Sequence, residues 1–347
     1  MKINKLAVLA LLGAFVFNSC TDDNDDLIEL IPEGDYTDGF FVVNEGGFND
    51  GGTVSFISDD LNTVEQNIFN VVNHNADDLG VFTQSIFFDD SRAYVISNGS
   101  NLITVVDRYT FELIDVIDEG LSFPRYGTVL DGKAYVTNQD DYTTNADDYV
   151  AIIDLTTLTV EKSVVIGNYV EKIQENEGLL YIQGSAFGSG NKINVFDPST
   201  EAVLKSITTA EGLDSFEVVG DVVYTIGGGK FQEFSKSTGA EVSSLSFTTL
   251  NNPVNLDVEN GLAYFTNGKA VYSMLISVLE EPVTPLLTYE SNSAFGVMYG
   301  FSVKNDRIYI ADGGDFSSDS FVEIYTLDGA LLKNIPVGLA PNGFYFN

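Results

Sequence analysis

This sequence contains very few imidazole and thiol groups, the side chains that most often act as a general base, a strong nucleophile or a soft metal ligand. Its 347 residues contain one histidine, His74, and one cysteine, Cys20, against 51 Asp and Glu. One histidine excludes a multi-histidine metal centre, and one cysteine excludes an intramolecular disulfide and a cysteine-based zinc site. A general base would have to be His74 or a carboxylate, and the chain has neither a Gly-x-Ser-x-Gly elbow nor a phosphate-binding loop. We therefore expect a protein that is not an enzyme.

Clustered carboxylates could instead hold a hard cation. Asp140, Asp141, Asp147 and Asp148 lie close together in one polar segment. Calcium prefers several oxygen ligands, but this spacing does not match an EF-hand loop. In so acidic a chain, close pairs of acids are also expected by chance. The sequence predicts no cofactor and leaves a structural calcium ion at these four residues as an alternative.

Aromatic and amide side chains are the better candidates for chemistry, because they suit binding without catalysis. Flat rings together with amides, acids and one arginine fit a large, partly apolar ligand that also forms hydrogen bonds. The candidate ligand-binding residues are Asn44, Glu45, Phe48, Asn98, Arg125, Tyr126, Asn138, Asp140, Asp141, Tyr142, Tyr169, Phe187, Phe216, Asn267, Met298, Tyr299, Asp312, Asp315 and Asn342. The alternative, for Tyr169 and Phe216 above all, is that these rings pack in the core.

The net charge of −35 at pH 7 restricts the partners. Proteins that bind nucleic acid or anionic lipid surfaces carry basic patches that displace counterions. We therefore expect no nucleic acid as a partner, and contact with a membrane only through a lipid anchor. Hydrophobic residues make up 44% of the chain, which indicates a folded domain and not a disordered acidic one.

The N-terminus has the features of an export signal. Lys2 and Lys5 precede an apolar run over residues 6–17, which is too short to span a bilayer and suits a signal peptide. Asn18-Ser19-Cys20 follows and resembles the lipobox of bacterial lipoproteins, although Phe17 replaces the usual Leu or Val. The resemblance implies a signal peptide over residues 1–19, cleavage before Cys20 and acylation of Cys20. The alternative is an ordinary signal peptide followed by a chance cysteine.

An acidic segment follows the cysteine. Residues 21–26 contain four aspartates and resemble the surface-export signal of Bacteroidetes lipoproteins. This resemblance implies a cell-surface protein on an acidic tether over residues 20–38. The alternative is a solvated acidic linker with no signalling role.

An internal repeat identifies the elements that must position the candidate residues. The segment Tyr135-Val136-Thr137-Asn138 recurs in variant form at intervals of about 40 to 50 residues. The seven copies begin at Phe41, Tyr94, Tyr135, Tyr181, Tyr224, Tyr264 and Tyr309. Turns such as Asp131-Gly132 and Asn260-Gly261 supply the positive φ of a two-residue hairpin before a copy. The pattern is that of four-stranded propeller blades, whose strands we call A to D in chain order.

The two ends of the chain complete each other. The first repeat has strands B, C and D over residues 40–44, 53–57 and 64–69, but no strand A precedes them. Phe344-Tyr345-Phe346 is a spare apolar segment after the last blade. Pairing it with the first repeat closes the ring and removes open sheet edges. We therefore predict an all-β, seven-bladed β-propeller of four-stranded antiparallel blades over residues 39–347, in which the C-terminal strand completes blade one.

Tyr135-Val136-Thr137-Asn138 is the literal signature of the YVTN-repeat (YncE-like) β-propeller family, and the chain resembles that family over nearly all of its mature length. With its lipobox and acidic tether it also resembles a group of Bacteroidetes surface propellers that capture cobalamin or iron-siderophore complexes for a TonB-dependent transporter. The resemblance implies the fold strongly and the ligand weakly, since the signature residues are strand and turn positions.

In this strand order the B–C loops and the D–A connections share one face, where the loops over residues 45–52, 139–148, 185–191 and 313–320 are expected to be long. Because function usually lies on long loops over a rigid scaffold, we place binding there. The resemblance then implies a lipid-anchored outer-membrane protein, facing the cell surface, that binds a small nutrient complex (a cobalamin-type corrinoid or a ferric siderophore) and delivers it to a TonB-dependent transporter. A surface for protein–protein interaction and a cation-dependent hydrolase or lactonase remain as alternatives.

Overall fold

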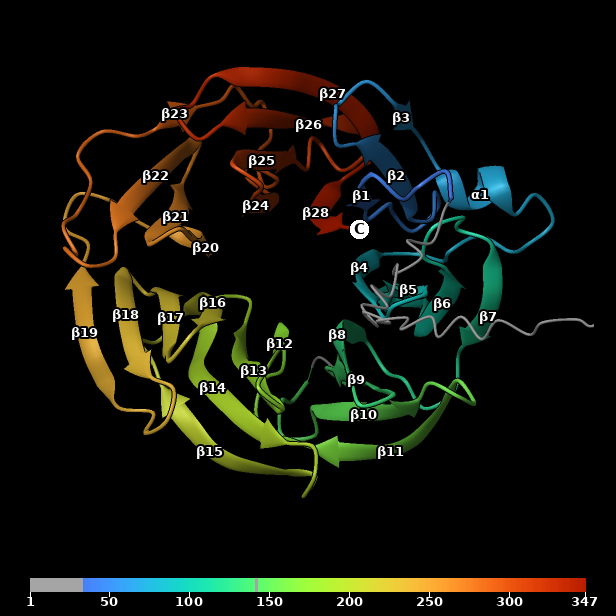
Figure 1. The fold of residues 1–347 in the computed structure, drawn as a ribbon, viewed down its shortest axis with the longest axis horizontal. Coiled ribbons are helices and arrows are strands. Elements are labelled where there is room, and N and C mark those ends of the chain that lie inside the picture. Colours follow the sequence, from blue (N-terminus) through green and yellow to red (C-terminus); the bar gives the residue numbers. More distant parts are fainter. Residues whose placement is uncertain (1–33, 141–142) are drawn as a thin grey trace, which may run out of the picture. The chain divides into compact units, whose positions relative to one another are not determined.

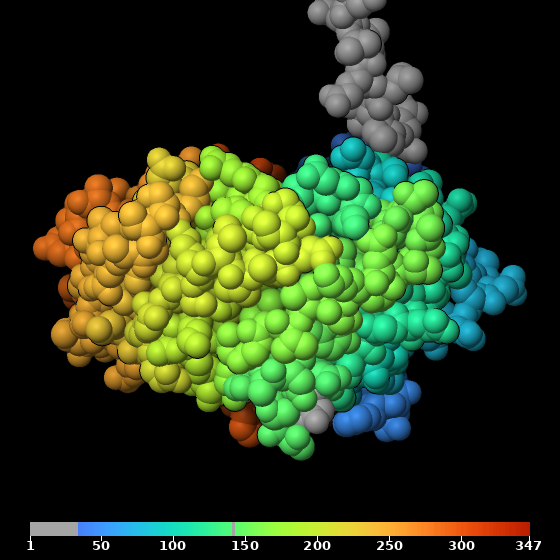
Figure 2. Space-filling model, turned by 90° about the horizontal axis from the view of Figure 1, so that it is seen from below, coloured from blue at the N-terminus to red at the C-terminus, as the bar shows by residue number. Residues whose placement is uncertain are grey.

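Seven four-stranded antiparallel sheets stand in a ring, as the sequence predicts (Figure 1). The computed structural model describes residues 34–140 and 143–347, which belong to one compact unit. In Figure 2 neighbouring blades are in contact along the wall of the ring, and the B–C loops of blades 1 (blue) and 3 (green) extend beyond its lower edge. The fold class is therefore confirmed as a seven-bladed β-propeller.

The strands of blades 1 to 4 follow chain order except at the closure. Blade 1 consists of β28 (Pro341–Phe346), β1 (Gly39–Asn44), β2 (Thr53–Ser58) and β3 (Val64–Glu65). Blade 2 consists of β4 (Thr83–Phe88), β5 (Arg92–Ser97), β6 (Leu102–Asp107) and β7 (Leu113–Ile117). Blade 3 consists of β8 (Pro124–Leu130), β9 (Lys133–Asn138), β10 (Tyr149–Asp154) and β11 (Thr159–Val165). Blade 4 consists of β12 (Ile173–Asn176), β13 (Leu179–Ala186), β14 (Ser189–Asp197) and β15 (Ala202–Thr208).

The last three blades repeat the arrangement. Blade 5 consists of β16 (Leu213–Val219), β17 (Val222–Gly227), β18 (Lys230–Ser235) and β19 (Glu241–Ser246). Blade 6 consists of β20 (Val254–Glu259), β21 (Leu262–Asn267), β22 (Ala270–Leu275) and β23 (Leu287–Thr288). Blade 7 consists of β24 (Gly300–Lys304), β25 (Arg307–Asp312), β26 (Asp319–Thr326) and β27 (Leu331–Leu339).

The repeated signature forms the second strand of each blade, which is buried on both faces. In β9 the side chain of Tyr135 packs into the cluster shared with blade 4, whereas Ala134 and Val136 pack into the cluster shared with blade 2. A strand buried on both faces needs a continuous apolar run, which is why the signature does not alternate with polar residues. The Asp131-Gly132 turn before it has φ values of 50° and 75°, as expected for a two-residue hairpin.

The ring closes through its two ends. Strand β28 pairs antiparallel with β1, and Phe344 lies opposite Val42 in the register. The rings of Phe344 and Phe346 pack with Phe40 and Tyr309 at centroid distances of 5.1 to 6.2 Å, which ties blade 1 to blade 7. The predicted closure is therefore confirmed.

Two predicted boundaries are wrong. The fourth strand of blade 1 ends at Glu65 and does not reach residue 69, because the chain turns into a short helix, α1 (Ile68–Val72), whose Ile68 and Phe69 are buried in the core. The tether does not extend to residue 38, because Tyr36 is buried against Phe56 and Phe111 and its N–H donates to the Tyr109 carbonyl (3.0 Å). Residues 1–33, which include the signal peptide and Cys20, lie outside the described residues. No helix in the described part of the chain is long and apolar enough to cross a membrane.

Removing the aromatic side chain of Phe344, where the ring of blades closes, should lower the stability of the propeller. We expect Phe344→Ala to lower the free energy of unfolding by about 3 kcal/mol, because it leaves a cavity where blades 1 and 7 meet. Urea unfolding followed by circular dichroism measures this. The matched control is Leu204→Ala on the exposed outer strand of blade 4, where we expect a change within about 0.5 kcal/mol. Equal effects of the two substitutions would contradict the closure argument.

Candidate functional site

A cavity of about 820 Å³ lies at the mouth of the central channel, on the face of the B–C loops and D–A connections. All seven blades contribute to its lining. The lining includes acids, cations, amides and tyrosines, together with the aromatic rings of Phe82, Phe187, Phe301 and Phe344. This mixed surface can contact both the apolar and the hydrogen-bonding parts of a ligand.

One wall of the cavity is held by an ion pair. The Arg125 guanidinium donates to both carboxylate oxygens of Glu171, at 2.7 to 3.2 Å. Gln139 Nε2 also donates to Glu171 (2.8 Å), so the carboxylate is fixed from two sides. The guanidinium lies over the exposed ring of Phe187, with 6.0 Å to the ring centroid. The pair therefore positions Arg125 before any ligand arrives.

Tyrosines and a second carboxylate form the adjoining wall. Tyr299 donates its hydroxyl proton to Glu45, and Gln84 Nε2 donates to the Tyr126 hydroxyl (3.1 Å). Burial raises the pKa of Glu45 above its ordinary value, although the Tyr299 hydrogen bond and the Arg125 charge oppose that shift. Burial also raises the pKa of Tyr126 to about 12. Both phenols are therefore protonated at neutral pH and can donate or accept hydrogen bonds.

The opposite wall comes from the first strands of blades 4 to 6, the residues just before them and the second strand of blade 4, β13. It carries Lys172, Gln183, Asp214 and Asn255. Asp214 accepts a hydrogen bond from the Asn255 N–H (2.8 Å), and Gln183 Nε2 donates to the Asp214 carbonyl (2.8 Å). The Gln183 Oε1 atom is buried without a hydrogen-bond partner in the described residues. The Gln183 Oε1 atom in this wall can therefore accept a further hydrogen bond.

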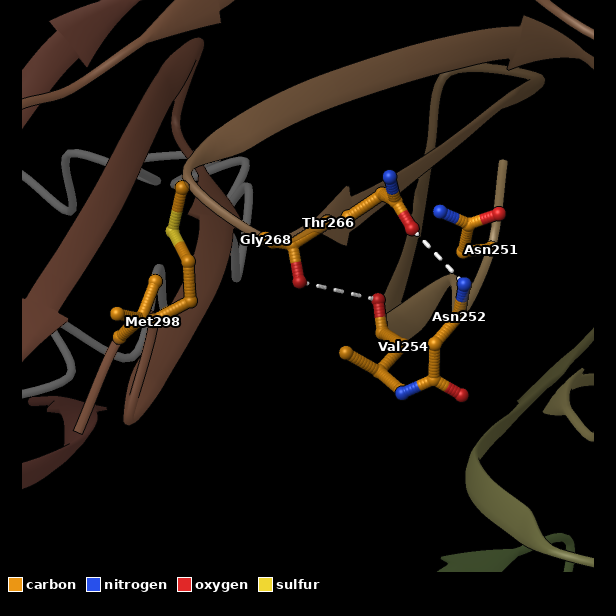
Figure 3. A pocket seen from close by; sticks show the side chains of 8 residues that line it. Asn251, Asn252, Val254, Thr266, Gly268 and Met298 are labelled. Carbon is orange, nitrogen blue, oxygen red and sulfur yellow. Dashed lines mark hydrogen bonds between the residues drawn. The ribbon is translucent and has the colours of Figure 1, made fainter. Parts of the chain in front are cut away.

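Two side pockets extend the cavity. A pocket of about 420 Å³ between blades 6 and 7 shares Asn252 and Val254 with it, and its polar side faces Met298 (Figure 3). In that pocket the Asn252 N–H donates to Asn267 Oδ1 (3.0 Å). A second pocket of about 370 Å³ shares Phe187 with the cavity and is lined by Gln139, Asp148 and Tyr169 among others. We refer to the cavity and its two adjoining pockets together as the three-lobed hollow.

Deeper in the channel, the first strands of blades 5 and 6 carry half-buried acids. Glu217 accepts from the Val258 N–H (2.6 Å), and Asp257 accepts from the Val303 N–H (2.8 Å). Burial, assisted by the charge of Asp257, raises the pKa of Glu217 to about 8. Burial also raises the pKa of Asp257 to about 6.

The structure brings many of the predicted residues to this face. Seven line the central cavity: Glu45, Asn98, Arg125, Tyr126, Phe187, Tyr299 and Asn342. Asn267 and Met298 line one side pocket and Tyr169 lines the other. Phe48 is 82% exposed at a loop tip. Asp315 is exposed in the blade 7 loop, where its carboxylate accepts hydrogen bonds from the Ser317 and Ser318 N–H groups. Asp141 and Tyr142 lie outside the described residues, and Asp140 lies beside them.

Four of the predicted ligand-binding residues do not line the cavity, because their side chains lie inside the fold. Asn44 is fully buried and donates to Thr53 and Ser55 on the next strand, while Asn138 is fully buried and accepts from the Ser122 N–H (3.0 Å). Phe216 packs in the core between blades 4 and 5, as the alternative interpretation had it. Asp312 is 2% exposed and accepts from the Tyr289 hydroxyl (2.8 Å).

The expected long loop over residues 185–191 is also wrong, because β13 and β14 extend into it and leave only a tight turn at Phe187-Gly188. Within residues 34–140 and 143–347, no three His, Cys, Asp or Glu side chains form a group that could hold a metal ion. Asp147 and Asp148 each keep one buried carboxylate oxygen without a partner among those residues. Burial raises the pKa of Asp148 to about 7.

The sequence prediction missed several lining residues, among them Gln84, Glu171, Lys172, Gln183, Asp214, Asn255 and Tyr345. Most of them lie at or just before the first strand of a blade, or on the closing strand β28. The available signal was the closure itself, since the inner strands of a ring must face the channel. The notable omission is Lys172, a second cation at the mouth beside Arg125.

Comparisons with known proteins agree on the fold. Residues 38–230 match a family described as "Domain of unknown function (DUF5074)". No curated protein matches the chain. Among solved structures, a quinonprotein alcohol dehydrogenase-like protein from Bacteroides thetaiotaomicron is 16% identical, with a TM-score of 0.65 over 90% of this chain and 78% of that one.

Two further structures are similar. Hydrazine synthase from Kuenenia stuttgartiensis is 17% identical, with a TM-score of 0.56 over 77% of this chain and 92% of that one. The computationally designed protein Ika8 is 10% identical, with a TM-score of 0.58 over 90% of this chain and 92% of that one. At these identities the likeness shows the fold alone.

The half-buried acid Glu217 should make the stability of the ring depend on pH. Its raised pKa means that the folded state favours the neutral form, so its stabilising contribution is present below about pH 4.5 and is lost as the pH rises through about 8. We expect Glu217→Gln to remove about 2 to 4 kcal/mol of the fall in unfolding free energy between about pH 5 and about pH 9.

Urea unfolding of both proteins at several pH values measures the difference. Glu119→Gln, at an exposed surface position, is the matched control. A wild-type and a Glu217→Gln profile that run parallel over this range would contradict the prediction.

Proposed function

This chain belongs to the family described as "Domain of unknown function (DUF5074)", whose description assigns no activity. From the geometry, we propose that it binds a large, partly apolar ligand in the three-lobed hollow without transforming it. The single observation that carries the proposal is that two side pockets adjoin the 820 Å³ cavity and share lining residues with it. A compact ligand would fill the centre only, whereas a ligand with a core and side arms can occupy all three lobes.

The lining suits such a ligand in its chemistry as well as its size. Aromatic rings at the rim, among them Phe187, can stack on flat apolar parts. Tyr126, Tyr299 and Gln183 offer hydrogen bonds that are already oriented by their neighbours. Preorganised polar groups reduce the ordering cost of binding. We therefore retain the two ligand classes expected from the sequence, a cobalamin-type corrinoid and a ferric siderophore.

The proposed setting is the outer membrane. The lipobox at Asn18-Ser19-Cys20 and the acidic residues after it support a lipid-anchored protein exposed at the cell surface. There the protein would capture a nutrient complex and deliver it to a TonB-dependent transporter. The tether would hold the binding face close to the membrane and raise the effective concentration of ligand at the transporter. The resemblance to the YVTN-repeat surface propellers is the basis for this setting.

A protein–protein platform is the second candidate, and one observation favours it. Phe48 and Phe187 are 82% and 76% exposed on the cavity face, and Phe295, between blades 6 and 7, is 88% exposed. Exposed large apolar side chains gathered on one face are typical of surfaces that contact another macromolecule. A partner for this face would need to cover the rim without filling the lobes.

A ligand screen separates the two candidates. We expect one coloured complex among cobalamins, ferric siderophores and haem to co-elute with the purified full-length chain on a sizing column, followed by its visible absorbance. Phe187→Ala should weaken that binding about tenfold, because the ring contacts both the cavity and a side pocket. Phe295→Ala is the matched control, since this equally exposed ring does not line the cavity. Failure of every complex to co-elute would favour the protein–protein platform.

The lipid anchor has its own test. We expect the wild-type chain, expressed in an export-competent bacterium, to partition into the detergent phase of a cloud-point extraction, because acyl chains dominate its membrane affinity. Cys20→Ala should move it to the aqueous phase or retain the uncleaved precursor. Detergent-phase partition that is unchanged by Cys20→Ala would contradict acylation at this residue.

A further inference from the structure

We propose that the central cavity selects its ligand by charge: it accepts neutral or cationic complexes and excludes polyanionic ones. The inference rests on the proposed function, since it concerns the ligand of the same cavity. It distinguishes between ligand classes that are similar in size and aromatic content, and it follows from how the charged groups at the channel mouth are paired.

Arg125, a cation at the mouth, already forms an ion pair with Glu171. Arg125 and Glu171 are 15% and 13% exposed, and three hydrogen bonds join them. An anionic ligand would have to displace Glu171 from Arg125, but Gln139 holds the same carboxylate in place. Breaking a buried pair leaves an uncompensated charge, which costs more than the new contact returns. Arg125 therefore serves the cavity wall and not an incoming anion.

The remaining charges favour a positive ligand. Glu45, Glu171 and Asp214 line the cavity against Arg125 and Lys172. Deeper in the channel, Asp257 lies close enough to Lys172 for the lysine charge to lower its pKa against the effect of burial. The Lys172 ammonium group forms no hydrogen bond or ion pair within the described part of the chain, but Asp257 lies close enough to offset part of its charge. The cavity as a whole is electronegative.

The aromatic rings at the rim and the net charge of the whole protein also favour a neutral or positive ligand over a polyanion. The exposed rings of Phe48 and Phe187 present negative π-faces, and Arg125 already lies over one of them. The net charge of −35 repels an approaching polyanion before it reaches the mouth. A ligand with apolar surface and zero or positive charge meets no such barrier.

Three coloured probes test the inference on the purified full-length chain in neutral detergent: a neutral cyano-corrinoid, a cationic ferric trihydroxamate and a trianionic ferric triscatecholate. We expect the neutral or the cationic probe to bind in equilibrium dialysis and the trianion not to bind. Affinity for the cationic probe should fall as salt is raised, because screening weakens the attraction. Equal or tighter binding of the trianion would overturn the inference and leave the proposed function standing. Binding of none of the three would remove the proposed function itself.

Charge-changing variants of the cavity provide the sharper measurement. Asp214→Asn keeps an acceptor for the Asn255 N–H and removes one negative charge, so affinity for the cationic probe should fall about three- to tenfold. Lys172→Gln should raise it by a similar factor. The readout is the ratio of the affinities for the cationic and the neutral probe, which should fall in Asp214→Asn and rise in Lys172→Gln. A merely structural disturbance would weaken the binding of both probes alike and leave this ratio unchanged.

The matched control is Glu112→Gln, at an exposed position outside the cavity lining, which changes the net charge by the same amount as Asp214→Asn. We expect it to alter the affinity for the cationic probe less than about twofold. Thermal unfolding midpoints confirm that each variant folds. If Lys172→Gln abolished the binding of the probes that bind the wild-type chain, Lys172 would be an anchor for a negatively charged group of the ligand. That result would overturn the inference.

Discussion

The first strands of neighbouring blades lie side by side around the channel without pairing, so each has backbone groups that another blade must satisfy. Side chains make these bonds. Gln174 accepts from the Val218 N–H (2.8 Å) and donates to the Val218 carbonyl (3.0 Å), which joins blade 4 to blade 5. Ser85 donates to the Arg125 carbonyl (2.7 Å), which joins blade 2 to blade 3. An unpaired buried backbone group costs as much as a lost hydrogen bond, and the radius of the ring depends on these contacts.

The same constraint explains why the channel is acidic. A free N–H on an inner strand needs an acceptor, and carboxylates from the preceding blade supply it at Asn255, Val258 and Val303. The acids are placed there to bond the backbone, and their desolvation raises the pKa of Glu217 and Asp257. The central cavity lies at the mouth of this channel. Asp214 both lines that cavity and accepts the Asn255 N–H, so one side chain serves the stability of the ring and the charge selection that we propose.

The four strands of a blade have different roles, because they differ in burial. Outer strands such as β7 and β19 are largely exposed, and second strands such as β1 are buried on both faces. Inner strands are intermediate, because one edge faces the channel. Chemistry that a ligand can reach therefore has to come from the ends of the inner strands and from the loops that meet them. Arg125 on β8 and Tyr299 just before β24 occupy such positions.

The sequence by itself determined the architecture. Seven copies of one strand pattern, hairpin turns such as Asp131-Gly132 and the spare Phe344-Tyr345-Phe346 segment were enough to predict the blade number and the closure, because local backbone preference and double-sided burial leave their trace in each repeat. The strand order also predicted the face on which the central cavity lies and seven of the residues that line it.

Only the tertiary structure decided which polar side chains reach the cavity. Asn44 and Asn138 are at the ends of second strands and turn inward to bond their neighbours, whereas Glu171, Lys172 and Asp214 face the channel. A polar residue at a strand end has the same local pattern in both cases. Asn44 and Asn138 find hydrogen-bond partners 9 to 16 residues away in the chain. Glu171 and Asp214 instead bond to groups of an adjacent blade, 46 and 41 residues away, and only the packing of the blades brings those partners to the channel mouth.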